Sequence, residues 1–338
     1  MWSVLKRFDY ASVTGHDLIC KKLRHAVSQN HVVNAYLFAG APGIGKKTVA
    51  RPFAASLLCE QPKDGAPCGE CTSCRLCAAG NHPDYKVITK PTDKKTIGVD
   101  VVREQIVKEA YIRPFTASRK VFLIENGELL TPEAQNALLK ILEEPPEYVF
   151  FIIAADSQNH MLETVLSRSL KLQFLPLSAS CCRSYFANLP SGTPERRTLA
   201  AAFAQGNIGR GKKMLEDDAF YELYQSAAEQ ICRLPQDTSA LLAMQQFLTA
   251  NKEQIQTVVE FMLIFLQDAL HQSLRIGAPL LCADRADAVN AFCSKADAGS
   301  IIRVTEAFVA YQNRLQKNAN FTIAGLELLT RIQEEFHD

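Results

Sequence analysis

Apolar residues in the first half of the chain alternate between short continuous runs and stretches with a helical period. The runs have the length of strands buried on both faces, as in a parallel sheet. Predicted strands are 35–39, 85–89, 121–124 and 148–155. Predicted helices, with apolar residues three and four positions apart, are 46–58, 101–112 and 132–142. Strands that alternate with helices in this way predict a doubly wound parallel α/β domain.

The strand signals stop after about residue 176, and helical patterning continues toward the end of the chain. Two segments that contain proline, 191–194 and 234–236, predict loops. The helical segments are 199–204, 220–232, 239–249, 254–274, 285–293 and 301–316. The second half of the chain is therefore predicted to be all helical.

Length and composition limit the protein class. A chain of 338 residues is long for one core, so two or three domains are expected. The net charge of +1 gives no overall electrostatic attraction to nucleic acid or to a membrane. No run of 18 apolar residues and no secretory leader is visible, so we expect a cytoplasmic protein without a membrane partner. Its 11 cysteines then favour reduced thiols, some of them metal ligands, over a disulfide framework.

A glycine-rich segment follows the first predicted strand. Residues 40–47 fit the phosphate-binding pattern G-x-x-x-x-G-K-[S/T] except at the last position, where Lys47 stands. In such a loop, glycines turn backbone N–H groups toward phosphates, and the lysine neutralises them. The candidate ATP ligands of this degenerate loop are Gly40, Gly43, Gly45, Lys46 and Thr48.

Several residues of this region predict that nucleotide is not hydrolysed. Lys47 cannot bind Mg²⁺, and Thr48 could replace the missing hydroxyl only in a shifted register. Pro52 removes a hydrogen bond early in the predicted helix.

The end of the strand 121–124 supports the same prediction. An active ATPase places Asp-Glu here for magnesium and water, but this chain has Glu125 and Asn126. Asparagine is no general base. The alternative is a working ATPase that uses Thr48 with Glu125 or Glu128, and turnover abolished by Lys46→Ala would favour it.

Five cysteines lie between residues 59 and 77, spaced C-x8-C-x2-C-x2-C with one more after a further x2. Zinc prefers four thiolates in a tetrahedron, and two-residue spacings present them well. The spacing predicts a structural Zn²⁺ site and leaves the choice between Cys59 and Cys77 open. A zinc-dependent nucleic-acid binder is a further alternative, although the nearly neutral charge argues against it.

Two polar motifs remain. His82-Pro83-Asp84 resembles a metal or acid–base pair, but Pro83 predicts a turn with a structural role. Arg168, between Ser167 and Ser169, follows the strand 148–155 and a short helical stretch. An arginine at such a place is usually a surface residue.

Taken together, these motifs resemble the clamp loader of bacterial DNA polymerase III, an AAA+ family. The residues on which the resemblance rests are 40–46, the cysteine spacing at 59–74, 80–84, the segment 133–146 ending in Glu-Glu-Pro-Pro, and Ser167-Arg168. The resemblance implies an AAA+ P-loop domain at 1–175 with a zinc module at 59–77, a helical lid at 176–217 and an all-α collar at 218–338. It also assigns the zinc to Cys59, Cys68, Cys71 and Cys74 and leaves Cys77 as a spare thiol.

The resemblance further implies a role inside a five-subunit ring. The family's ATPase subunits, gamma or tau, carry a sensor threonine where this chain has Ala155-Asp156. They also carry an arginine in the lid where this chain has Gly209, and its own arginine, Arg210, is the next residue. Arg168 matches the family's arginine finger, the side chain that reaches the ATP of the neighbouring subunit. The implied partners are gamma/tau and delta subunits and, through the complex, the sliding clamp and primed-template DNA.

Overall fold

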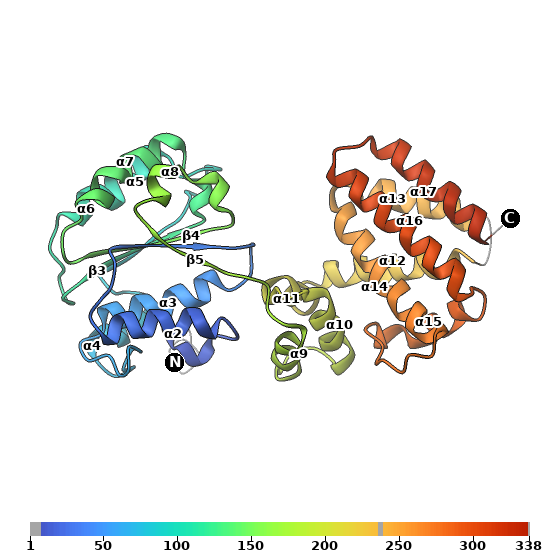
Figure 1. Ribbon diagram of the computed structural model, residues 1–338, viewed down its shortest axis with the longest axis horizontal. Coiled ribbons are helices and arrows are strands. Elements are labelled where there is room, and N and C mark those ends of the chain that lie inside the picture. Colours follow the sequence, from blue (N-terminus) through green and yellow to red (C-terminus); the bar gives the residue numbers. More distant parts are fainter. Residues whose placement is uncertain (1–7, 236–238, 337–338) are drawn as a thin grey trace. The chain divides into compact units, whose positions relative to one another are not determined.

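A computed structural model describes residues 8–235 and 239–336 of the chain (Figure 1). The chain divides into two compact units, Met1–Leu177 and Ser178–Asp338. The first unit combines a sheet with helices, and the described part of the second contains helices and no strand. The finer boundaries expected at residues 175 and 217 stay a prediction.

The first unit is built on a five-stranded parallel sheet in the order β2-β3-β4-β1-β5. The strands are β1 Ala35–Ala39, β2 Tyr85–Ile88, β3 Lys120–Glu125, β4 Val149–Ala155 and β5 Leu170–Gln173. Every residue of β1 and β4 is buried, as expected for central strands covered on both faces. The predicted doubly wound α/β class is confirmed.

Side chains of the sheet alternate between two hydrophobic cores. Val121 and Leu123 of β3 pack into one core, and Phe122 and Ile124 pack into the other. Helices α2, α3 and α4 lie on one side of the sheet, and α5, α6, α7 and α8 lie on the other (Figure 1). Their bounds are α2 Asp17–Ser28, α3 Lys46–Leu58, α4 Thr72–Ala79, α5 Val99–Val102, α6 Lys108–Ala110, α7 Pro132–Glu143 and α8 Glu163–Leu166. Short 3-10 turns are η2 Tyr10–Ser12, η4 Gly127–Leu129 and η5 Gln158–His160.

The second unit is a series of packed helices. They are α9 Ala179–Ala187, α10 Pro194–Ala204, α11 Ile208–Glu216, α12 Asp218–Arg233, α13 Ser239–Ala250, α14 Ile255–Ser273, α15 Ala286–Cys293, α16 Ala298–Gln316 and α17 Phe321–Phe336, with the turns η6 Lys252–Gln254 and η7 Ala283–Arg285. The core helix is α14, whose Phe261 packs against Phe203, Phe220 and Tyr224. Among residues 8–235 and 239–336, none of the helices has the length and apolar character that a bilayer crossing requires.

Three local features differ from the sequence-based prediction. The edge strand β5 was not predicted, because only Leu172 of its four residues is buried. The helix predicted at 101–112 is interrupted by a π-helical turn, η3 Arg103–Val107. No helix was predicted directly after Cys71, but Cys74 and Cys77 lie on helix α4.

Candidate functional site

The glycine-rich loop joins β1 to α3, as the sequence predicts. Gly43 and Gly45 adopt positive φ angles of 79° and 112°, a region that side chains disfavour. At Gly40, an added Cβ would lie 2.6 Å from the carbonyl oxygen of Phe174. His16 Nε2 lies 2.9 Å from the carbonyl oxygen of Ile44, so a residue outside the motif also holds the loop.

Lys46, the lysine of the loop, is satisfied within the protein. Its ammonium donates to the carbonyl oxygens of Gly40 and Ala41 and lies 2.7 Å from a carboxylate oxygen of Asp156. The side chain is only 6% exposed. Because an ammonium has three donors, these partners occupy all of them. A phosphate would have to displace Asp156 to bind Lys46.

Lys47 occupies the place of the magnesium-binding hydroxyl, and its side chain reaches the end of β3. Its ammonium donates to Glu125 Oε2 at 2.8 Å and to Asn126 Oδ1 at 3.2 Å. Arg51 adds a second cation 3.8 Å from Glu125. Two partly exposed cations therefore face the carboxylate that an active ATPase would turn to magnesium.

A hydrogen-bonded chain links the ends of β3 and β4. Asn126 adopts a left-handed conformation and donates from its amide to Glu128 Oε1. Glu128 Oε2 accepts from the backbone N–H of Asp156, whose carboxylate pairs with Lys46. Glu128 is therefore engaged with the segment that follows β4, and Thr48 lies exposed on α3.

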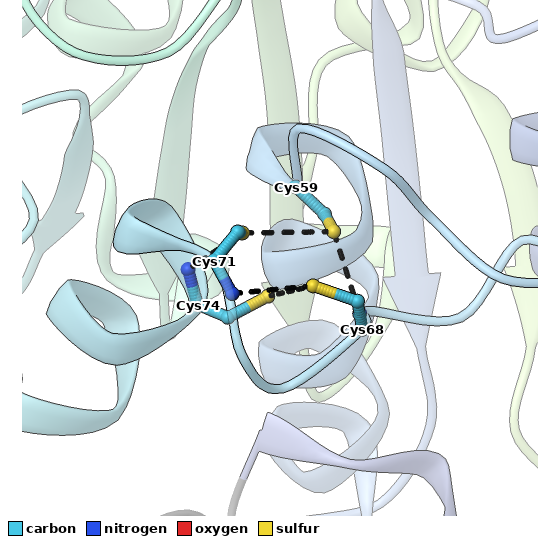
Figure 2. Close-up of side chains that lie close together, drawn as sticks. All are labelled: Cys59, Cys68, Cys71 and Cys74. Atoms are coloured by element: carbon cyan, nitrogen blue, oxygen red, sulfur yellow. Dashed lines mark hydrogen bonds between the residues drawn. The ribbon is translucent and has the colours of Figure 1, made fainter.

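The cysteine cluster lies where the end of α3 meets the start of α4 (Figure 2). The sulfur atoms of Cys59, Cys68, Cys71 and Cys74 all lie within 4.8 Å of one another. The pairs Cys59–Cys71 and Cys68–Cys74 are each 3.9 Å apart. Four sulfurs at 2.3 Å from a tetrahedral centre would lie about 3.8 Å apart, so the spacing fits a metal ion with four thiolate ligands.

Backbone donors around the cluster favour the thiolate form. N–H groups of Cys68, Cys71 and Cys74 each point to the sulfur of the preceding cysteine, at 3.3, 3.4 and 3.4 Å. Burial alone would raise the pKa of Cys68, but hydrogen bonds from the backbone of Glu70 and Cys71 and from the side chains of Cys59 and Cys71 lower it to about 7. Burial raises the pKa of Cys59 and of Cys74, so the thiolate form is not favoured at every position. Metals bind the thiolate rather than the thiol, so the sulfur spacing and the three backbone donors are what fit a metal ion.

The loop that carries Cys68 is held against α2. Gly65 has a φ of 74°, and a Cβ there would lie 1.8 Å from the carbonyl oxygen of Arg24. Cys77 is completely buried in the core beneath α3 and does not belong to the cluster. Of the two arrangements left open by the spacing, the structure forms the one with Cys59.

Arg168 lies in the turn between α8 and β5. Its Nη1 donates to the carbonyl oxygen of Thr164 at 2.9 Å and to the hydroxyl of Ser167 at 3.2 Å. Its Nη2 lies 2.6 Å from Glu143 Oε1 at the end of α7. The guanidinium is partly exposed, and the backbone beneath it is fixed by the helical turn and the strand.

The remaining polar motifs have structural partners. His82 Nδ1 accepts from the N–H of Asp84, and the Asp84 carboxylate accepts from three consecutive N–H groups of the loop before β3. In the second unit, Arg210 pairs with Glu260 and lies over the ring of Phe203.

Sequence reasoning missed three contacts of the candidate site. These are His16 on the loop, Asp156 on Lys46, and Glu143 on Arg168. Of these three partners, only Glu143 could have been suspected from the sequence. An acidic residue at the C-terminal end of a helix opposes the helix dipole, which suggests a nearby cation.

Comparisons with known proteins relate both units of the chain to DNA polymerase III subunits. A family model described as DNA polymerase III, delta subunit, matches residues 15–178, and a model of the C-terminal part of that subunit matches 219–334. The delta' subunit of Escherichia coli is 27% identical over 82% of this chain and 83% of its own length. The delta' subunit of Pseudomonas aeruginosa is 41% identical over 43% of each chain. The tau/gamma subunit of Haemophilus influenzae is 36% identical over 62% of this chain and 30% of its own.

The matched segments span less than half of the Haemophilus and Pseudomonas relatives. The two family models, in contrast, lie in sequence order along most of the chain, one on the α/β unit and one on the helical unit. The chain therefore belongs to the DNA polymerase III delta subunit family.

Proposed function

We propose that the chain acts as a delta'-type subunit of a clamp loader in the bacterial cytoplasm. It helps to load the sliding clamp of DNA polymerase III on primed DNA without hydrolysing ATP itself. Its direct partners are gamma/tau and delta subunits, and it reaches clamp and DNA through the complex. Family membership and the relatives named delta' support this proposal.

The observation that carries the proposal is the ion pair between Lys47 and Glu125. The Lys47 ammonium contacts the carboxylate that a magnesium site would need in an active ATPase, and the adjacent Asn126 cannot activate water. Lys46 is in turn held by Asp156. Bound ATP and Mg²⁺ would have to displace both pairs, so we propose that the subunit works without nucleotide turnover.

The chemical contribution of the chain is Arg168, offered to the ATP of the neighbouring subunit. A guanidinium is planar and always charged, and it stabilises the charge that develops on a transferred phosphoryl group. Its fixed backbone and partial exposure support this role.

The four-cysteine cluster is proposed to hold a structural Zn²⁺ ion. Cys59, Cys68, Cys71 and Cys74 would bind it, and the ion would supply a crosslink between the end of α3 and the start of α4. Four thiolates leave no coordination position for a substrate, so no step of catalysis is assigned to the metal.

The experiment that tests the proposal measures ATP hydrolysis in two settings. The purified chain is assayed alone and then with gamma/tau and delta subunits, clamp and primed DNA. We expect no turnover by the chain alone and strong stimulation in the mixture. In the assembled loader, Arg168→Ala should lower ATPase at least tenfold, on the scale of arginine-finger losses.

Each contrary outcome has a defined meaning. An unchanged rate with Arg168→Ala would refute the role in trans. Turnover by the chain alone, abolished by Lys46→Ala, would show that it is an active gamma/tau-like ATPase. A gel shift of primed DNA by the isolated chain would instead indicate direct nucleic-acid binding.

A further inference from the structure

The pair between Arg168 and Glu143 joins two elements that lie far apart in sequence. Arg168 follows α8, and Glu143 is the last residue of α7. Their charged atoms, Nη2 and Oε1, are 2.6 Å apart, while the two side chains are 34% and 49% exposed. An ion pair with this exposure contributes little to folding stability. Stability alone therefore gives no strong reason for an acid at this position.

Glu143 lies at the end of its helix where a negative charge is disfavoured. The C-terminal end of a helix carries partial negative charge, so a carboxylate there is unfavourable. Glu143 and the adjacent Glu144 are both acidic, and Pro145 prevents the helix from continuing. A carboxylate at this end gains from a nearby cation, and Arg168 is the cation it contacts.

The contacts divide the guanidinium into two parts. Both hydrogen bonds to Thr164 and Ser167 come from Nη1. Within residues 8–235 and 239–336, Nη2 meets only the carboxylate of Glu143, and Nε has no partner. Arginine carries five N–H groups, so donors remain for an incoming phosphate while the Glu143 pair stays in place.

We propose that Glu143 is a positioning residue that holds Arg168 ready for the ATP of the neighbouring subunit. The inference rests on the proposed function and adds a residue of this chain to it. A free arginine side chain samples many rotamers, and ordering it during the reaction slows the reaction. Glu143 orders the guanidinium beforehand, through the nitrogen that the Thr164 and Ser167 contacts leave unused.

The test uses the assembled loader with ATP, clamp and primed DNA, and compares four versions of this chain. They are the wild type, Glu143→Gln, Arg168→Ala and the double variant. Glu144→Gln is the matched control, because it removes the same charge from the same end of α7. Complex formation is checked for each version by gel filtration.

We expect Glu143→Gln to lower kcat about three- to tenfold while KM for ATP changes less than about twofold, since the interaction acts in the transition state. Glu144→Gln should leave both constants unchanged. In the Arg168→Ala background, Glu143→Gln should have no further effect, because its partner is gone.

The outcomes separate this inference from the proposed function. If Arg168→Ala itself has no effect, the finger role fails regardless of Glu143. If Arg168→Ala lowers kcat but Glu143→Gln does not, the positioning role is wrong. A rise in kcat with Glu143→Gln would mean that Glu143 restrains the arginine, and an additive loss in the double variant would place its effect elsewhere. Either result would overturn the inference.

Discussion

Asp84 supports the segment between α6 and β3 through one fully buried carboxylate. Its oxygens accept from the N–H groups of Phe115, Thr116 and Ala117 at 2.7, 2.8 and 2.9 Å. Burial raises the pKa of Asp84, but these three bonds outweigh it, and the pKa lies below its usual value. Replacement of Asp84 by Asn keeps the shape of the side chain and removes the charge.

The structure gives the expected cost of Asp84→Asn. An amide has one acceptor oxygen, which can serve Thr116 and Ala117, while its NH₂ group then faces the N–H of Phe115. A buried donor without a partner costs about 1–3 kcal/mol, and each bond that loses its charge loses about 1 kcal/mol. One unpaired donor and two weakened bonds sum to about 3–5 kcal/mol, or at least roughly a hundredfold increase in local opening.

Hydrogen exchange of the peptide that covers residues 109–120 measures this change directly. Asp93→Asn, on an exposed loop, is the control and should leave exchange unaltered. Because the folded pKa of Asp84 is depressed, its stabilisation is present above about pH 4 and is lost as pH falls through the folded pKa. The two proteins should therefore differ fully at about pH 7 and converge below about pH 4. Equal exchange at neutral pH would refute the reasoning.

Two matched pairs of variants test the cysteine module. Cys74→Ser should abolish binding of one zinc per chain, measured by metal analysis, and raise hydrogen exchange across residues 59–77. Cys77→Ser should keep the metal and lower only thermal stability, because Cys77 is a buried core residue; loss of zinc in this variant would contradict the assigned ligands. Gly65→Ala and Gly69→Ala both place Cβ at a positive φ, at a cost of about 1 kcal/mol. Only Gly65→Ala also meets a backbone carbonyl, that of Arg24, so its midpoint of urea unfolding should fall further, and equal midpoints would argue against that contact.

The sequence was sufficient to predict the central architecture because that signal is local. The strands β1, β3 and β4 are continuous apolar runs, and α3 and α7 show a helical period next to them. The edge strand β5 could not be predicted, since its residues are mostly exposed and its pairing with β1 is specified by position rather than by hydrophobicity. The helix α4 was not predicted, because the segment was assigned to the cysteine motif and glycines precede it.

The candidate site was predictable only in part, for the same reason. Motif spacing identified the loop lysines and the cysteines, which are close in sequence to their signals, whereas only the resemblance to the clamp loader pointed to Arg168. The partners of these residues are far away: Asp156 is separated by 110 residues from Lys46, and Glu125 by 78 from Lys47. Side-chain pairs over such distances depend on the strand order, and no local pattern reports them.

The glycines of the loop between β1 and α3 are explained by the fold even without nucleotide. Gly40 is needed because Phe174 of the chain after β5 approaches its Cα, and Gly43 and Gly45 are needed for their positive φ angles. A protein that no longer hydrolyses ATP would therefore still need these glycines to connect β1 to α3. The informative positions are those without a packing role, above all Lys47 and Asn126, where the residue type decides between a metal site and an internal ion pair. By this reasoning, an intact glycine pattern indicates the fold, and the residues at the ends of the strands indicate the chemistry.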